Sequence, residues 1–222
     1  MGLTRIIAGV WRLAIAGLCF AATAEAWSIP NRWVYFTFQA GFLMGLVMVW
    51  AGAATILDGI QPPAWMKNGV TVYVVIVALM AFLLPSSESS GSTLLPGASG
   101  AIVLHRVVPL MAVADFLLVD AHRRSRWEHV LVWMSYLPPY LAFVLIRGAL
   151  WPHSGPAAGG SPYPYAVIDP SSVGWIQLGI NCLELVVVLL GVALAVFIVD
   201  RMLPSSSIMG VAGRGRSSRS RR

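Results

Sequence analysis

Long apolar stretches separated by short polar links run along almost the whole chain. The apolar stretches lie at about residues 6–27, 33–57, 69–84, 101–120, 127–150 and 174–199. A helix needs about 20 mostly apolar residues to cross the hydrocarbon core of a bilayer, and these stretches approach or exceed that length. The pattern predicts an all-α integral membrane protein, with six transmembrane helices in one domain over residues 1–203.

The two ends of the chain need separate interpretation. The first apolar stretch imitates a signal peptide, because Arg5 precedes it and the small residues 22–26 could form a cleavage site. Arg12 interrupts its apolar run, which favours a retained membrane anchor over a cleaved signal. Residues 204–222 are rich in Ser, Gly and Arg and have too few apolar side chains to fold, so a disordered basic tail is expected.

Composition and charge narrow the class of protein. Of 222 residues, 58% are hydrophobic and 11% are charged, whereas soluble domains carry about 25% charged residues. The formal charge of +6 comes largely from five arginines after residue 212, without which ten basic residues face nine acidic ones. We therefore expect the tail to contact anionic lipid headgroups, and we expect no nucleic-acid binding.

The distribution of Lys and Arg predicts the orientation in the membrane. With six crossings, basic residues gather on one side, at Arg5, Lys67, residues 123–126, Arg201 and the tail. The other side holds only Arg32 and Arg147. Because cytoplasmic loops carry the excess of Lys and Arg, both termini are expected in the cytoplasm, with the protein in the cell's inner (plasma) membrane.

Two polar side chains from different predicted helices fall at one depth. Thr37 and His105 each lie four or five residues below the outer end of their helices, roughly 6–8 Å beneath the interface at about 1.5 Å per residue. A hydroxyl beside a neutral imidazole is the minimal activated nucleophile. The structural alternatives are a threonine that bonds its own backbone carbonyl and a histidine that bonds a neighbouring helix.

Other ionisable groups in the apolar stretches require partners, because an isolated charge in hydrocarbon is costly. Glu184, one turn from Asn181, is expected to pair with Arg106, or with Arg147 reaching inward. Asp115 lies at a depth similar to that of Arg12, which predicts a structural ion pair. Three histidines at or beyond helix ends are expected to be solvated surface residues: His122, His129 and His153.

The loop at residues 161–170 is aromatic and stiffened by prolines, and it lies on the predicted outer side. It could form part of an interfacial aromatic belt or a lid above Thr37 and His105. Asp169 in this loop could orient His105. The two cysteines, Cys19 and Cys182, fall in apolar stretches and predict packing thiols rather than a disulfide framework or a metal site.

Four motifs in order together resemble the androgen-induced protein family, a group of six-helix membrane proteins with bacterial relatives. The motifs are Tyr35-Phe36-Thr37-Phe38-Gln39, Leu104-His105-Arg106-Val107-Val108-Pro109 with Asp115, Tyr136-Leu137-Pro138-Pro139-Tyr140 with Arg147-Gly148, and Tyr163-Pro164-Tyr165 with Asp169. Bacterial members often continue the first motif with Ser-Asn, where this chain has Ala40-Gly41.

The resemblance implies a chemistry. Animal members are threonine hydrolases that cleave fatty acid esters of hydroxy fatty acids, and their threonine and histidine correspond to Thr37 and His105. The resemblance thus implies a membrane-embedded lipid-ester hydrolase acting on an amphipathic fatty-acid ester, with no metal or cofactor. Substrate-binding or supporting roles are then expected for Gln39, Arg106, Tyr163, Tyr165, Asp169, Asn181 and Glu184.

Two other functions fit parts of the pattern. A non-catalytic lipid-binding or transport protein would use Glu184, Arg106 and Asn181 to line a polar path, and would bind lipid without turnover. A haem-carrying electron-transfer bundle needs two axial ligands at one level. Because His105 lies in the outer part of its helix and His129 in the inner part of its own, the haem hypothesis is disfavoured.

The orientation can be tested by labelling in intact cells. Cysteines placed at Ser90 and Ser161 should react with an impermeant thiol reagent, because both loops are predicted to lie outside. A cysteine at Ser206 should not react. Labelling of the Ser206 variant alone would reverse the assignment.

Overall fold

The computed structural model describes residues 2–83, 93–95, 98–155 and 160–209. Within these ranges, six helical segments are long and apolar enough to cross a membrane, which confirms the predicted all-α multi-pass architecture. The segments are Leu3–Ser28, Phe36–Leu57, Ala64–Leu83, Gly100–Leu118, Trp127–Leu150 and Pro170–Met202. The link between the predicted stretches 69–84 and 101–120, which was expected to be an exposed outer loop, falls mostly outside the described ranges. Its described part forms a small hairpin of β1 (Thr93–Leu95) and β2 (Ala98–Ser99).

The first three spans follow the predicted stretches, with differences at their ends. The first consists of α1 (Leu3–Thr23) and α2 (Glu25–Ser28). A 3₁₀ turn, η1 (Arg32–Val34), then leads into the second span, α3 (Phe36–Leu57), and the third is α4 (Ala64–Leu83). Because α4 begins before the predicted residue 69, Lys67 and Asn68 belong to the helix, where both are buried.

The fourth span changes its helical geometry at His105. It runs from α5 (Gly100–Ile102) through a π-helical turn, η2 (Val103–Val107), into α6 (Val108–Leu118). Pro109 lacks the N–H that would bond the His105 carbonyl, and in a regular α-helix its ring would clash with that carbonyl. A widened turn relieves this conflict, and π-helical turns inside α-helices occur frequently at functional sites.

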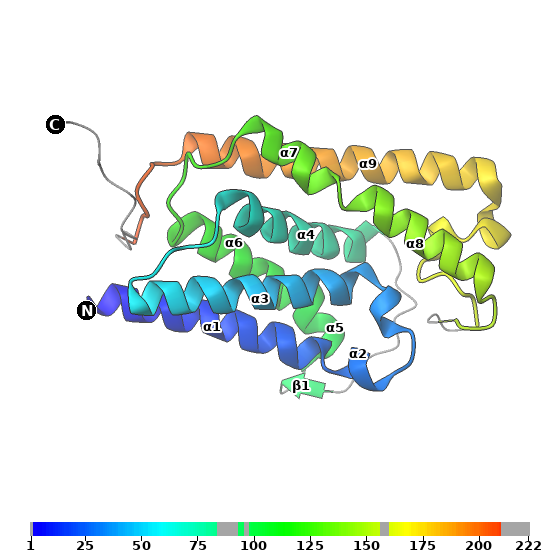
Figure 1. Ribbon diagram of the computed structural model, residues 1–222, viewed down its shortest axis with the longest axis horizontal. Helices are drawn as coiled ribbons and strands as arrows, with labels where there is room; N and C mark the ends of the chain where they lie inside the picture. Colours follow the sequence, from blue (N-terminus) through cyan, green and yellow to red (C-terminus); the bar gives the residue numbers. More distant parts are fainter. Residues whose placement is uncertain (1, 84–92, 96–97, 156–159, 210–222) are drawn as a thin grey trace.

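The fifth span is broken, and the sixth is long. α7 (Trp127–Met134) and α8 (Leu137–Leu150) meet at residues 135–136, before the proline pair Pro138–Pro139 at the start of α8. Prolines are tolerated in a first helical turn but not in a helix interior, so the chain changes direction here (Figure 1). A 3₁₀ turn, η3 (Ala166–Ile168), then precedes α9 (Pro170–Met202), which bends at Gly174, where φ is 77°.

The helices form two packed groups that share α4 and α6 (Figure 1). One apolar core lies between α1, α3, α4, η2 and α6, around residues such as Ile15, Met44 and Val108. The other lies between α4, α6, α7 and the half of α9 nearer Met202, around Trp133 and Leu189. We call the end of the bundle that holds Leu3 and Met202 the termini end, and the opposite end, which holds residues 151–155 and 160–169, the loop end.

A buried cluster of four charges lies toward the termini end. Arg12 Nε lies 2.9 Å from Asp115 Oδ1, and Arg12 Nη2 lies 2.6 Å from Asp120 Oδ1, which confirms the predicted Arg12–Asp115 pair. Lys67 Nζ contacts the second oxygen of both carboxylates. Arg12 also donates to Thr55 Oγ1 at 2.8 Å. The cluster therefore joins α1, α3, α4 and the end of α6, with two charges of each sign.

A second polar group closes the termini end and corrects one prediction. His122, expected to be solvated, is buried, with Nδ1 3.6 Å from Asp200 Oδ1. Asp200, near the end of α9, also accepts hydrogen bonds from the backbone N–H groups of Arg124 and Ser125. The expectation was wrong because a helix distant in sequence covers the turn. His129 is half-buried and His153 is exposed.

The chain after α9 also differs from the expected disordered tail. Ser207 Oγ donates to the Leu118 carbonyl at 3.3 Å, and Met209 N donates to the same carbonyl at 3.0 Å. Residues 204–209 therefore pack against the end of α6. The basic remainder of the predicted tail, residues 210–222, lies outside the described residues.

The charge cluster yields a stability prediction. Asp120→Leu leaves one carboxylate against two buried cations, so it should destabilise the protein by about 3–5 kcal/mol. Adding Lys67→Met leaves the Arg12–Asp115 pair balanced and should recover part of the loss in a thermal unfolding measurement. If the double variant is as unstable as the two single changes added together, the cluster is not a coupled unit.

Candidate active site

Thr37 lies in the first turn of α3, at the loop end of the bundle. Tyr35 is the N-cap residue, in extended conformation, and the helix begins at Phe36. The Thr37 side chain is 5% exposed, and its hydroxyl lies 3.4 Å from His105 Nε2. Thr37 and His105, which the sequence placed at one depth, are therefore in contact although they lie 68 positions apart in the chain.

Other buried threonines of the bundle show how Thr37 differs. Thr23, Thr55 and Thr71 each donate their hydroxyl to the carbonyl four residues earlier in their own helix. For Thr37 that carbonyl belongs to Trp33, which lies before α3 and accepts from the Gln39 side chain at 2.6 Å. The usual backbone partner is thus engaged elsewhere, and the Thr37 hydroxyl faces the imidazole instead.

The surroundings of His105 define its tautomer. His105 Nδ1 lies 2.8 Å from the Ala101 carbonyl, one turn earlier. A carbonyl oxygen only accepts hydrogen bonds, so in the neutral ring Nδ1 carries the proton and Nε2 presents its lone pair. Nε2 is the nitrogen that faces Thr37. The ring is therefore oriented to accept the Thr37 proton.

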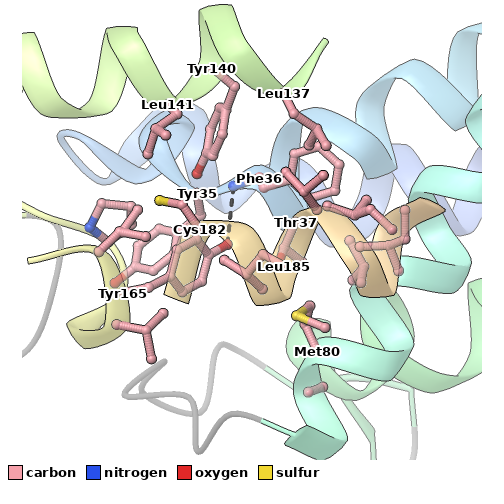
Figure 2. Close-up of a pocket in the computed structure, with 18 of the residues that line it drawn as sticks. Tyr35, Phe36, Thr37, Met80, Leu137, Tyr140, Leu141, Tyr165, Cys182 and Leu185 are labelled. Atoms are coloured by element: carbon pink, nitrogen blue, oxygen red, sulfur yellow. Dashed lines mark hydrogen bonds between the residues drawn. The ribbon is translucent and has the colours of Figure 1, made fainter. Parts of the chain in front are cut away.

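Thr37 and His105 both line a cavity of about 680 Å³. Figure 2 shows this cavity with Thr37 in its wall. Pockets that bury small ligands have volumes of about 300–1,000 Å³ and are mostly apolar, with few polar groups. Beyond Thr37 and His105, the polar side chains that line this cavity are Tyr35, Tyr140, Tyr165 and Cys182. The remaining wall is aliphatic or aromatic and comes mainly from α4, α8 and α9. The cavity therefore suits a hydrocarbon chain with one reactive polar group.

The loop at residues 161–170 contributes to the wall of the cavity. Residues 164–168 line the cavity. The Tyr165 hydroxyl accepts a hydrogen bond from Phe36 N at 3.2 Å, and Figure 2 shows Tyr165 beside Tyr35 at this end of the cavity. The loop thus contacts the residue that precedes Thr37 in α3.

Several polar side chains hold this loop in place. Asp169 accepts hydrogen bonds from Ser161, Ser171 and Ser172 and caps the first turn of α9. Asp169 therefore anchors the loop and does not orient His105, whose Nδ1 is bound by Ala101. Gly148 on α8 has no side chain, and the ring of Tyr163 occupies the space that a Cβ at this position would fill. This contact packs the loop against α8.

Two further anchors come from α8 and α9. Arg147 is buried and donates to the carbonyls of Pro162 and Ser154, at 3.1 and 2.8 Å. Asn181 donates to the Val167 carbonyl at 2.8 Å. Arg147 thus fixes the loop rather than pairing with Glu184, and Asn181 supports the cavity wall rather than lining a polar path.

The predicted pairing of Glu184 with Arg106 is wrong. Both side chains are exposed on the outside of the bundle, and within the described ranges no ion pair joins them. Neither residue lines the cavity. The depth of a residue in a helix does not specify the direction in which its side chain points, and both of these side chains are exposed.

Gln39 supports the site through its neighbours. Its side chain donates to the Trp33 carbonyl and accepts a hydrogen bond from the Tyr136 hydroxyl. Tyr140, on the next turn of α8, donates to the Val34 carbonyl at 2.9 Å. Gln39 and the two tyrosines thus join the start of α3 to the α7–α8 break. Tyr136 and Tyr140 belong to one of the motifs that carry the family resemblance, but no role was predicted for them.

The two cysteine side chains lie in different surroundings. Cys19 is fully buried in the core between α1 and α3, as expected for a packing thiol, whereas Cys182 lines the cavity. Within the described residues, no group of three or more His, Cys, Asp or Glu side chains is arranged to hold a metal ion.

Comparisons of this chain with protein-family models, with curated proteins and with solved structures found no match.

The loop anchor at Asp169 predicts a pH dependence. Burial raises the pKa of its carboxyl, but hydrogen bonds from Ser171, Ser161 and Ser172 outweigh burial and hold the pKa below its ordinary value. Ionised Asp169 therefore stabilises the fold above the unfolded pKa of about 3.9, and this contribution is lost as the pH falls through the lower folded value.

Asp169→Asn should thus unfold at a lower temperature than the wild type near neutral pH, and the gap should narrow below about pH 4. Thermal unfolding of both proteins across this range measures the gap. A gap that stays constant into acid would show that the charge of Asp169 contributes nothing.

Proposed function

We propose that this protein is a membrane-embedded lipid-ester hydrolase in which Thr37 is the nucleophile and His105 is the general base. The observation that carries the proposal is the contact between Thr37 Oγ1 and Nε2 of His105, whose Nδ1 lies on the Ala101 carbonyl, inside an apolar cavity. The resemblance to the androgen-induced protein family points to the same two residues.

The first half of the reaction forms an acyl-enzyme. The Thr37 hydroxyl attacks the ester carbonyl carbon while His105 Nε2 takes its proton. The distance of 3.4 Å is typical of catalytic hydrogen bonds that tighten only when substrate is bound. His105 then gives the proton to the departing alkoxide, which leaves as an alcohol, and the acyl group remains esterified to Thr37.

The carbonyl oxygen becomes negatively charged in the transition state and needs hydrogen-bond donors. Thr37 and Phe38 occupy the first turn of α3, where backbone N–H groups point out of the helix toward its positive end. Tyr165 binds the N–H of Phe36 and holds this turn in place. The same helix end thus supplies the nucleophile and the donors for the developing oxyanion.

The second half releases the acid. A water molecule attacks the acyl-threonine carbonyl, and His105 Nε2 accepts its proton. The proton then returns to Thr37 Oγ1 as the bond between that oxygen and the acyl carbon breaks. The products are a fatty acid and an alcohol, and the enzyme returns to its starting state.

The lipid-transport alternative loses its proposed polar path. Glu184 and Arg106 face outward, and Asn181 is bonded to the Val167 carbonyl. A non-catalytic lipid-binding protein would use the same apolar cavity, so the two functions differ in turnover alone. Neither function requires a metal or a cofactor.

The decisive variants remove one polar group each. Thr37→Ala should abolish hydrolysis of lipid esters by the purified protein, and Thr37→Ser should retain part of it because the hydroxyl survives. His105→Ala should lower the rate as far as Thr37→Ala, and the double variant should be no slower, because residues that act as one unit are not additive.

Thr71→Ala is the matched control. Thr71 is buried in α4 and bonds its own helix, away from the cavity, so this variant should hydrolyse esters at the wild-type rate. Turnover that persists in Thr37→Ala would refute the threonine mechanism. Lipid binding without turnover in the wild type would favour the binding protein.

A further inference from the structure

The cavity extends past Thr37 in both directions along the helices. Tyr140 on α8 donates to the Val34 carbonyl, which places it beside the start of α3, where Thr37 lies. Leu141 lies on the loop side of Tyr140, while Leu137 and Met134 follow toward the termini end, and all three line the cavity. Thr37 is therefore part-way along the cavity rather than at its end.

The part toward the termini end, which we call the deep arm, is lined by Ile76, Val77, Met134, Leu137 and Leu189. Of the lining residues on α4, α7 and α9, the ones nearest the termini end are Ile76, Met134 and Leu189. Beyond them, α4, α7 and α9 pack directly, through residues such as Val72, Trp133 and Ala193. Ile76, Met134 and Leu189 therefore form the floor of the deep arm.

The deep arm and the rest of the cavity differ in chemistry. None of the five side chains that define the deep arm carries a nitrogen or oxygen atom. The part on the loop side contains Cys182 and the polar backbone of residues 164–168, with Tyr165. Burying a polar group without a partner is costly, so only a hydrocarbon chain fits the deep arm, and the more polar half of a ligand lies toward the loop.

We propose that the deep arm holds the acyl chain of the ester and that Leu189, with Ile76 and Met134, sets the longest chain accepted. This inference rests on the proposed hydrolase function and assigns the two halves of its substrate. With the acyl chain below Thr37, the leaving alcohol lies on the loop side, under Tyr165 and Pro164. A hydroxyl or carboxylate on the alcohol half then meets the loop rather than hydrocarbon.

The test changes the floor of the deep arm. Leu189→Phe should shorten the arm, and Leu189→Ala should lengthen it. The matched control is Leu190→Phe, on the next residue of α9, whose side chain is 39% exposed and lies outside the cavity. Each methylene that no longer fits should lower affinity about fourfold, the equivalent of the hydrophobic free energy of one buried CH₂.

Two readouts separate the chain assignment from the hydrolase proposal. The first is the rate of hydrolysis of p-nitrophenyl esters of graded acyl length. The second is the rise in unfolding temperature on adding straight-chain fatty acids of graded length to variants that also carry Thr37→Ala, which requires no turnover. In both series the longest effective chain should become shorter in Leu189→Phe, longer in Leu189→Ala and stay the same in Leu190→Phe.

The outcomes are distinct. If esters are hydrolysed through Thr37 but the cut-off is the same in both Leu189 variants, or Leu190→Phe shifts it equally, the chain assignment is overturned and the hydrolase stands. If no ester is hydrolysed but the fatty-acid cut-off moves with Leu189, the deep arm is supported as a chain-binding site and the hydrolase proposal fails.

Discussion

The buried cluster of Arg12, Lys67, Asp115 and Asp120 is the constraint on which the rest of the bundle depends. Charges in a membrane-spanning segment are tolerated only when paired, and here two cations and two carboxylates neutralise each other from three spans. The cluster ties α6 to α1 and α4, and through Thr55 to α3. The span that carries His105 and the helix that carries Thr37 are thereby fixed together at the end of the bundle away from the site.

The loop end, in contrast, contains a cavity. α9 packs against α4 and α7 in the half nearer Met202, but the break before Pro138 redirects α8, and the side chains of α8 and α9 face a cavity beyond that level. The loop that lines this cavity is held by Arg147, Asp169 and Asn181. The bundle thus has a charge-linked end and an apolar cavity at the other end, an arrangement that suits the proposed lipid-ester site.

The sequence predicted the features that depend on the length of a helix and on the depth of a residue along it. Helix rise placed Thr37 and His105 at one depth, and Arg12 and Asp115 at another, because depth follows from counting residues. Depth alone left open whether the helices that carry them are neighbours. It could not predict direction around a helix axis, so Glu184 and Arg106 were wrongly paired. Nor could it predict that Asp200 would cover His122 from a distant helix. The role of Asp169 was available locally, since Asp-Pro-Ser-Ser is a typical helix N-cap sequence.

The central claim is that Thr37 is a nucleophile activated by His105, and covalent trapping tests it most directly. A fluorophosphonate probe mimics an ester and leaves a stable adduct on the attacking oxygen, which peptide mass spectrometry can locate. The account predicts a single adduct, on Thr37, that is strongly reduced in His105→Ala. An adduct on another residue, or undiminished labelling of Thr37→Ala, would contradict it.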